Sequence, residues 1–524
     1  MKFTPTLAEL DALRGQGNLC PVYTEILADL ETPVSAYLKL AGGPATFLLE
    51  SITGGEHIGR YSFIGGDPYL TLRMHNGVAQ ATQGGYKQTI SYTDPLLVLE
   101  SFLSAYRPVR LPDLPIFVGG AVGYLSYESA RYFERLPMPE ARAYDMPDSW
   151  WMFVDTLLAF DHARNRILVI SHVHLDAPDL AAEYARVTAK IQAVVARLRN
   201  PRATEPRNQG TREPGNQAAT EPRDQGTEGL RDQRADRDAA IQPPSAPTSN
   251  VSRDDYFANV EKCKAYVMAG DIFQVQISQR FSKRTAADPF TIYRALRTVN
   301  PSPYMFFIST GEGDLVGASP EMLVRVQDGE VETRPIAGTR WRGKTPAEDA
   351  QLADELLADE KERAEHLMLV DLGRNDVGRI AVPGTVQVPT FMTVEKYSHV
   401  QHIVSAVTGR LRPELTAIDA LRACFPAGTV TGAPKIRAME VIAEMEHDQR
   451  GIYAGGVGHL GFNGDLDICI ALRTMIVKDG VVYAQAAAGV VADSTPEYEY
   501  NESRNKAAAS LRAIEVAEEL TIDD

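Results

Sequence analysis

Two pairs of glutamates stand at helical spacing in distant parts of the chain: Glu362 with Glu365, and Glu499 with Glu502. The members of an i,i+3 pair lie on one helix face, and Lys506 shares the face of Glu502. Carboxylates on rigid helices suit a hard cation such as Mg²⁺, which binds through one or two of them and keeps positions for water and substrate. A single such pair is more often a solvated helix face, so the neighbouring motifs decide the interpretation.

Three other features of the sequence could take part in binding or catalysis. His402 could serve as a general base, although a lone histidine in an apolar segment is more often a core residue. Arg473 stands in an otherwise apolar stretch, where a buried guanidinium needs an anionic partner. The glycine-rich segment 428–435 precedes a predicted helix and could hold a carboxylate, or could be a plain helix-entry turn. The GxGxxG at 456–461 is followed by a predicted strand, which excludes a dinucleotide site.

The first part of the chain is predicted to be rich in short strands. An Asn76-Gly77 turn joins two of them. The expected strands are 45–50, 69–74, 78–82, 151–160 and 166–173, and the expected helices are 95–105 and 177–198.

The later part mixes strands with long helices. Ser252 is expected to cap a helix that ends before Gly270, and the strand after it places Gln274 and Gln276 on one face. The remaining elements are a hairpin over 321–335, one long helix over 347–372, a three-stranded meander over 452–490 with Arg473 inside a strand, and a helix from Pro496. Hairpins and meanders with separate helices predict an α+β fold, with antiparallel sheets packed as a sandwich and helices outside.

Composition excludes several classes of protein. The chain has 524 residues and a net charge of −16, which disfavours nucleic acid and anionic membranes as partners. No apolar run reaches the ~18 residues that a membrane-spanning helix needs, and the N-terminus has no signal-peptide pattern. The four cysteines are scattered without a CxxC, which argues against zinc and disulfides and for the cytoplasm.

One stretch divides the sequence. Residues 199–250 contain almost no large apolar side chains, and the segment 204–211 nearly repeats at 220–227. Such a stretch cannot bury enough surface to offset its ordering entropy, so we expect a disordered linker or insertion. It separates a predicted N-terminal domain, 1–198, from a predicted catalytic domain, 251–524.

The motifs together resemble a known family, the chorismate-utilising enzymes. The resemblance covers 251–515 and rests on segments 335–339, 361–366, 370–376, 428–435 and 489–494. Segments 48–51, 59–65 and 300–305 resemble the large subunits (component I) of anthranilate synthases. Isochorismate and salicylate synthases carry a lysine in place of Gln274, and aminodeoxychorismate synthases often carry one in place of Ala337.

The resemblance implies roles for individual residues. It makes Glu365 and Glu502 direct Mg²⁺ ligands with Glu362 and Glu499 in support, and it makes Glu321 the acid that protonates the departing hydroxyl group. The implied catalytic residues are His402, Glu321, Thr429 and Lys506. The implied chorismate-binding residues are Gly338, Thr339, Thr429, Tyr453, Arg473, Gly489 and Lys506.

The resemblance also implies partners and regulation. The expected reaction converts chorismate and ammonia to anthranilate and pyruvate, the first committed step of tryptophan biosynthesis. Ammonia would come from glutamine through a separate glutamine amidotransferase subunit, component II, in a hetero-oligomer. Feedback by tryptophan would act at Glu50, Ser51, Pro303, Tyr304 and Met305. Aminodeoxychorismate synthase component I and a non-catalytic tryptophan-sensing subunit remain as alternatives.

Overall fold

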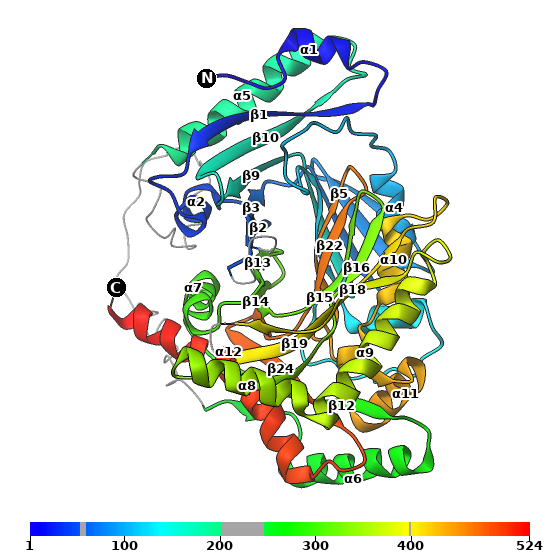
Figure 1. Cartoon of the computed structure of the whole chain (residues 1–524). Coiled ribbons are helices and arrows are strands. Elements are labelled where there is room, and N and C mark those ends of the chain that lie inside the picture. The colour runs from blue at the N-terminus through cyan, green and yellow to red at the C-terminus, as the bar shows by residue number, and fades with distance from the viewer. Residues whose placement is uncertain (53–58, 201–245, 398–399, 524) are drawn as a thin grey trace, which may run out of the picture.

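The structure, a computed structural model, describes residues 1–52, 59–200, 246–397 and 400–523 (Figure 1). Two antiparallel sheets of twelve strands each face one another, and helices cover their outer faces. This arrangement confirms the predicted α+β sandwich. None of the helices in these ranges is both long and apolar enough to cross a membrane.

The first sheet follows the order β1, β10, β9, β3, β2, β13, β14, β23, β24, β12, β11, with β20 beside β12. Its strands are β1 (Leu19–Leu27), β2 (Thr46–Glu50), β3 (Tyr61–Gly66), β9 (Thr156–Asp161), β10 (Arg166–His174), β11 (Thr248–Ser249), β12 (Gln274–Arg284), β13 (Tyr304–Ser309), β14 (Asp314–Ser319), β20 (Gly432–Ala433), β23 (Thr474–Lys478) and β24 (Val481–Val490).

The second sheet follows the order β17, β19, β16, β15, β22, β21, β7, β8, β4, β5, β6, with β18 beside β19. Its strands are β4 (Leu70–His75), β5 (Val78–Gln83), β6 (Tyr86–Ser91), β7 (Gly120–Leu125), β8 (Ser149–Val154), β15 (Met322–Gln327), β16 (Glu330–Thr333), β17 (Ile336–Trp341), β18 (Gln387–Lys396), β19 (Val400–Arg410), β21 (Gly456–Gly461) and β22 (Leu466–Ile470).

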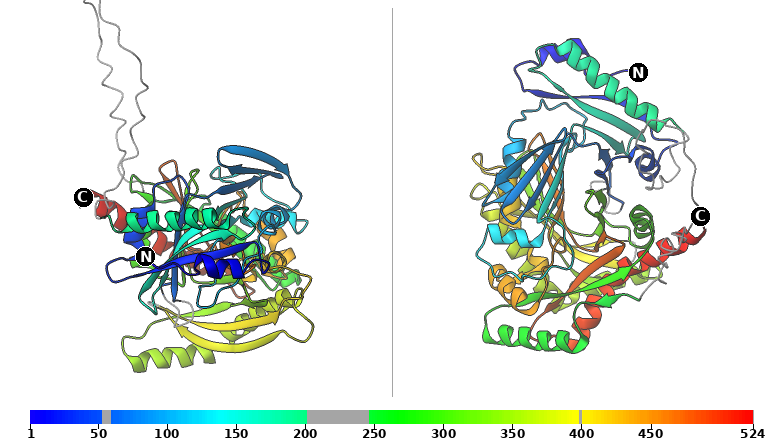
Figure 2. Two further views of the ribbon diagram at one scale, coloured as in Figure 1. Left: turned by 90° about the horizontal axis from the view of Figure 1, so that it is seen from above. Right: turned by 180° about the vertical axis from the view of Figure 1, so that it is seen from behind.

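Helices complete the two outer layers, and Figure 2 shows them from above and from behind. Against the first sheet pack α2 (Pro33–Leu40), α5 (Leu180–Leu198), α7 (Pro289–Val299) and α12 (Pro496–Asp523), with α1 (Leu7–Ala12) on α5. Against the second sheet lie α8 (Pro346–Ala358), α9 (Glu360–Gly378), α10 (Ala417–Cys424) and, on α10, α4 (Pro95–Leu103). Finally, α6 (Arg253–Ala269) and α11 (Lys435–Met445) pack on β12.

Strand alternation explains how three apolar layers form. On β13, Phe306 and Ile308 point into the core between the sheets, whereas Met305 and Phe307 point to the outer core under the helices. Large side chains such as Trp150 and Tyr124 fill the middle layer. Each such buried side chain contributes about 1.5–3 kcal/mol of hydrophobic free energy, so the sandwich is a rigid frame for a site.

Strands from both sides of the 201–245 segment join each sheet. In the first sheet β2 pairs with β13, and in the second β7 pairs with β21. The division into two domains, 1–198 and 251–524, therefore stays a prediction. Most of the predicted linker lies outside the described residues. Its last part includes β11, which pairs with β12.

Three predicted elements were wrong in the same way, because each is interrupted where the chain changes direction. The strand predicted over 151–160 breaks at Asp155 into β8 of the second sheet and β9 of the first. The helix predicted over 347–372 is two helices, because Asp359 takes an extended conformation and its carboxylate caps α9 through the N–H groups of Lys361 and Glu362. Apolar periodicity does not reveal such breaks.

The third correction concerns the segment 452–490. It forms four strands instead of a three-stranded meander, and the chain crosses from the second sheet to the first between β22 and β23. Arg473 lies at this crossover with a φ of 47°, outside any strand. The left-handed backbone at a non-glycine residue is uncommon, and it places the guanidinium at the junction of the sheets.

Candidate active site

Glu321 lies where the chain passes from β14 in the first sheet to β15 in the second. Its side chain is buried, with 6% of the residue exposed. Burial raises the pKa of Glu321 to about 8, although the Thr429 hydroxyl, the Ile336 N–H and the charge of Arg473 oppose the shift. The carboxyl therefore carries a proton at neutral pH and can donate it.

His402 lies on β19 and is also buried. Its Nδ1 is 2.7 Å from the carbonyl oxygen of Gly338 and 3.2 Å from Oγ1 of Thr339. A carbonyl only accepts hydrogen bonds, so we assign the proton to Nδ1, which leaves Nε2 free to accept one. Burial lowers the pKa of His402 to about 4, so the ring is neutral at physiological pH. Gly338 has a φ of 71°, which explains a glycine there.

Two cations face both of these groups. Arg473 and Lys506 both act electrostatically on Glu321 and on His402, so the four side chains lie near one another. Lys506 extends from α12 and donates to the Ala487 carbonyl at 3.1 Å. Arg473 forms no ion pair within the described part of the chain, and a guanidinium in such an enclosed position favours an anionic ligand.

β24 and β12 pair beside these groups, since Lys506 donates to Ala487 of β24. Gly489 lies opposite Gln276, and a Cβ atom on Gly489 would come within 2.7 Å of Nε2 of Gln274. A side chain at position 489 would therefore displace the amide ends of Gln274 and Gln276. Gln274 and Gln276 both point inward, as their predicted common face requires, and Gln274 donates to Oε1 of Glu365 at 2.8 Å. The sequence did not reveal this contact between β12 and α9.

Tyr453 lies beside β24. Its hydroxyl contacts the Ala487 backbone, and burial raises its pKa, so it stays a neutral hydrogen-bonding group. Arg450, which sequence reasoning missed, lies under the ring, with its guanidinium 5.7 Å from the ring centroid. Arg450 is buried and paired with Glu446 at 2.7 Å, so it supports the pocket wall.

The four glutamates of the two pairs lie on α9 and α12, whose N-terminal parts approach one another. Glu362 is 3.2 Å from Arg340, Glu365 accepts from Gln274, and Glu502 is 2.7 Å from Lys506. The two pairs converge, because the carboxylates of both α9 and α12 raise the pKa of Tyr498. In the described ranges no three acidic, histidine or cysteine side chains form a ready coordination sphere, so the assignment of metal ligands stays a prediction.

The chemistry of these carboxylates fits a divalent cation. Oε2 of Glu499 is buried without a partner, and burial, together with Glu502, raises the pKa of Glu499 to about 7. Burial and Glu365 likewise raise the pKa of Glu362. Bound Mg²⁺ would reduce the repulsion between these neighbouring carboxylates. The residues present therefore suit that ion.

The residues predicted to bind an effector adjoin one another at the end of β2 and the start of β13, but on two faces of the sheet. Glu50 and Met305 face α7 and the outer core, whereas the Tyr304 hydroxyl reaches Asp467 of the second sheet. Glu50 lies directly opposite Met305 in the register of the two strands, and Pro303 and Tyr304 adjoin it in the chain. The Ser51 hydroxyl is buried without a partner. The structure adds Arg297 of α7, whose guanidinium binds Glu50 through two hydrogen bonds of 2.9 and 3.1 Å.

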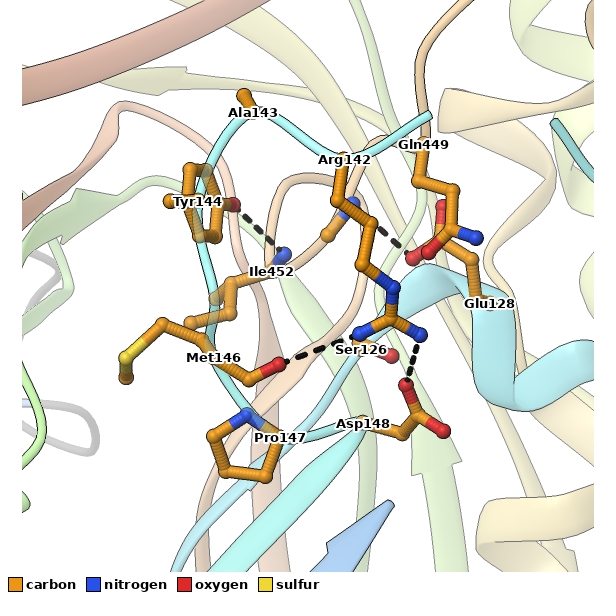
Figure 3. A pocket seen from close by; sticks show the side chains of 11 residues that line it. Ser126, Glu128, Arg142, Ala143, Tyr144, Met146, Pro147, Asp148, Gln449 and Ile452 are labelled. Carbon is orange, nitrogen blue, oxygen red and sulfur yellow. Dashed lines mark hydrogen bonds and ion pairs between the residues drawn. The ribbon is translucent and has the colours of Figure 1, made fainter. Parts of the chain in front are cut away.

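Two cavities occur in the described part of the structure. One, of about 370 Å³, opens beside Glu321 and Thr429 under α9. The other, of about 300 Å³, contains none of the predicted site residues (Figure 3). There Arg142 binds the Met146 carbonyl and Asp148, and Tyr144 accepts from the N–H of Ile452. These contacts hold the segment that leads into Tyr453.

Comparison with known proteins shows which family the chain is similar to. Residues 45–512 match the family of chorismate binding enzymes. Anthranilate synthase component 1 of Acetivibrio thermocellus is 43% identical over 518 residues, which covers 99% of this chain and 100% of that protein. The protein of the same name from Synechocystis sp. is 44% identical over 526 residues, covering 98% of this chain and 99% of its own.

Solved structures show the same fold. Anthranilate synthase component I from Streptococcus pneumoniae has a TM-score of 0.72 at 36% identity, covering 93% of this chain and 98% of that one. The menaquinone-specific isochorismate synthase of Escherichia coli has a TM-score of 0.64 at 18% identity, covering 98% and 99%, which shows the fold alone. The match over residues 45–512 and the full-length relatives show that this chain belongs to the family of chorismate binding enzymes.

Proposed function

We propose that this protein is the large subunit, component I, of anthranilate synthase, which converts chorismate and ammonia to anthranilate and pyruvate in tryptophan biosynthesis. The observation that carries the proposal is a protonated carboxyl, Glu321, and a neutral imidazole, His402, that face the same two cations. One group can give a proton and the other can take one at the same pH. The relatives named above support the choice of reaction.

Chorismate carries a ring carboxylate and an enolpyruvyl carboxylate. Arg473, Lys506, Tyr453 and the backbone at Gly489 are the groups that would hold the enolpyruvyl carboxylate, while Gly338, Thr339 and Thr429 line the pocket. The protein is negative overall, with a net charge of −16. The two cations nevertheless attract a dianion, because charges in an enclosed pocket are poorly screened.

The first step needs an acid. Ammonia adds at C2 of the ring, the C4–O bond breaks with its electrons on oxygen, and the Glu321 proton converts the departing hydroxide to water. Ammonia needs no deprotonation before it attacks. An enzyme that uses water as the nucleophile needs a base at this position. With ammonia as the nucleophile, the neutral amide of Gln274, which donates to Glu365, meets the requirement.

The second step needs a base. His402 Nε2 removes the proton from C2, and the enolpyruvyl C–O bond breaks to release pyruvate as the ring becomes aromatic. The Gly338 carbonyl fixes the tautomer that makes Nε2 the acceptor.

Mg²⁺ would be held by Glu365 and Glu502, with Glu362 and Glu499 in support. When bound, it supplies positive charge next to the ring carboxylate. Arg340, Gln274 and Lys506 now occupy these carboxylates and would have to yield part of their contacts.

The proposal includes a partner and an effector. A glutamine amidotransferase subunit would supply ammonia in the cytoplasm. Tryptophan would bind at Glu50, Ser51, Pro303, Tyr304 and Met305. Its ammonium group would compete with Arg297 for Glu50, and the unpartnered Ser51 hydroxyl would gain a hydrogen bond.

The test is to incubate the purified chain with chorismate, ammonium and Mg²⁺ and to follow anthranilate fluorescence together with pyruvate. Aminodeoxychorismate synthase is the nearest alternative, and formation of 4-amino-4-deoxychorismate without pyruvate would establish it. The absence of any turnover would favour a non-catalytic tryptophan-sensing subunit.

A further inference from the structure

The corner that carries Glu321 is fastened on its N-terminal side to the strand of Tyr304. The Ser319 hydroxyl lies 3.3 Å from both the backbone N and the backbone O of Glu321. Ser319 in turn lies directly opposite Tyr304 in the register of β13 and β14. A shift of Tyr304 along its strand would therefore move the backbone of Glu321.

The same tyrosine also reaches the C-terminal side of this corner by a bridge between the sheets. Its hydroxyl donates to Oδ1 of Asp467 on β22 at 3.1 Å. Asp467 accepts from Nε and Nη2 of Arg325 at 3.0 and 2.7 Å. Arg325 lies on β15, the strand that begins directly after Glu321. We call the three side chains Tyr304, Asp467 and Arg325 the inter-sheet bridge; its strands are labelled in Figure 1.

β22 touches the corner a second time. The N–H of Ile470 donates to the carbonyl oxygen of Glu321 at 3.0 Å, and the chain then runs to Arg473 at the crossover. The position of β22 therefore bears on both an acid and a cation of the pocket.

The bridge is enclosed. The Asp467 side chain is 11% exposed and the Arg325 side chain 20% exposed, so water and salt screen their attraction little. His459 lies opposite Asp467 on β21, and burial lowers its pKa to about 4, so no second cation competes for Asp467 from that side. The bridge can thus act as one unit that is made or broken.

We propose that the inter-sheet bridge couples the effector site to Glu321, with Asp467 as the positioning residue. The inference rests on the proposed binding of tryptophan at the ends of β2 and β13, where Ser51 and Tyr304 adjoin Glu50 and Met305. A ligand that packs against Tyr304 moves its hydroxyl relative to the second sheet, and both ends of the Glu321 corner depend on that contact. Effector occupancy would in this way change the alignment of the acid without any contact between the two ligands.

The test is Asp467→Asn in the full chain, which keeps the size and removes the charge that holds Arg325. The matched control is Asp465→Asn, because Asp465 is buried, adjoins the same strand and pairs with Arg110 at 2.9 Å, away from the corner. Calorimetry without ammonia measures the affinity for tryptophan, with and without chorismate and Mg²⁺, and turnover is measured as anthranilate formation.

In the wild type and in Asp465→Asn, chorismate should weaken tryptophan binding by about 5- to 150-fold, the usual range of allosteric coupling. In Asp467→Asn the factor should fall to about twofold or less, and saturating tryptophan should leave most of the turnover. The affinity for tryptophan measured without chorismate should change by less than about tenfold between the wild type and Asp467→Asn.

Wild-type coupling in a folded Asp467→Asn, or equal loss of coupling in Asp465→Asn, would overturn the proposal. If Asp467→Asn does not fold, the double variant Asp467→Asn with Arg325→Gln removes both charges and must show the same uncoupling. A wild type that forms anthranilate but ignores tryptophan would overturn the coupling and leave the proposed reaction intact.

Discussion

Replacing the catalytic acid should make the protein more stable while it destroys the activity. Glu321 has an ordinary pKa of 4.5 and a pKa of about 8 in the folded protein, because it is buried. Below the unfolded pKa the carboxyl is protonated in both states, and its titration does not change the free energy of unfolding. Between the two pKa values only the unfolded state releases the proton, so the free energy of unfolding falls as the pH rises. Glu321→Gln keeps the shape and removes the titration.

The magnitude follows from the two pKa values. At about 1.4 kcal/mol for each pKa unit, the cost of burying Glu321 is about 1 kcal/mol at pH 5 and about 3 kcal/mol at pH 7. The unfolding free energy of Glu321→Gln should exceed that of the wild type by about these amounts. Turnover should fall by about 10²–10⁴-fold, the usual contribution of a general acid.

Urea unfolding of both proteins at the two pH values, without substrate, measures the difference directly. Glu497→Gln is the control, because this side chain is 62% exposed on α12, where it forms a surface ion pair with Arg253 and accepts a hydrogen bond from Asn501 at 3.4 Å. A Glu321→Gln variant that is less stable than the wild type at pH 7, or a difference that does not grow with pH, would refute the assignment of Glu321 as a buried, protonated acid.

Three further predictions follow from the same geometry. Turnover per unit of free ammonia should be level between about pH 5 and 7 and fall above about pH 8 as Glu321 loses its proton, while His402 stays neutral throughout; a pH–rate profile that rises across pH 8 would contradict this. Glu365→Gln and Glu502→Gln should each lose Mg²⁺-dependent turnover with an unchanged melting temperature, and full activity at saturating Mg²⁺ would remove them as ligands. Ser51→Phe should fill the space beside the unpartnered hydroxyl and abolish inhibition by tryptophan without loss of turnover; equal inhibition of variant and wild type would place the effector elsewhere.

Local patterns predicted much of the fold. The turns at Asn76-Gly77 and Asp328-Gly329 have left-handed backbones, and Ser252 caps α6 as its side chain predicts. The breaks at Asp155 and Arg473 were missed because a change of sheet imposes them, and the break at Asp359 was missed because its N-cap lies inside a continuous helical pattern. Apolar residues on both sides of such a break continue the same period.

The candidate site divides in a similar way. Motifs singled out Glu321, His402 and both glutamate pairs, and the tertiary structure adds the contacts between their distant segments. The contacts Gln274 with Glu365 and Tyr304 with Asp467 join residues 91 and 163 positions apart. Single-sequence patterns carry no information on such pairings, which depend on the register of the strands and on which sheets face each other.

The most direct measurement is the fate of ¹⁵N-labelled ammonium and chorismate after incubation with the wild-type chain and Mg²⁺, analysed by mass spectrometry with enzymatic determination of pyruvate. The proposed acid at Glu321 and base at His402 predict one labelled anthranilate and one pyruvate for every chorismate consumed, and the loss of both products in Glu321→Gln. Labelled 4-amino-4-deoxychorismate, unlabelled isochorismate, or amination without release of pyruvate would contradict the account.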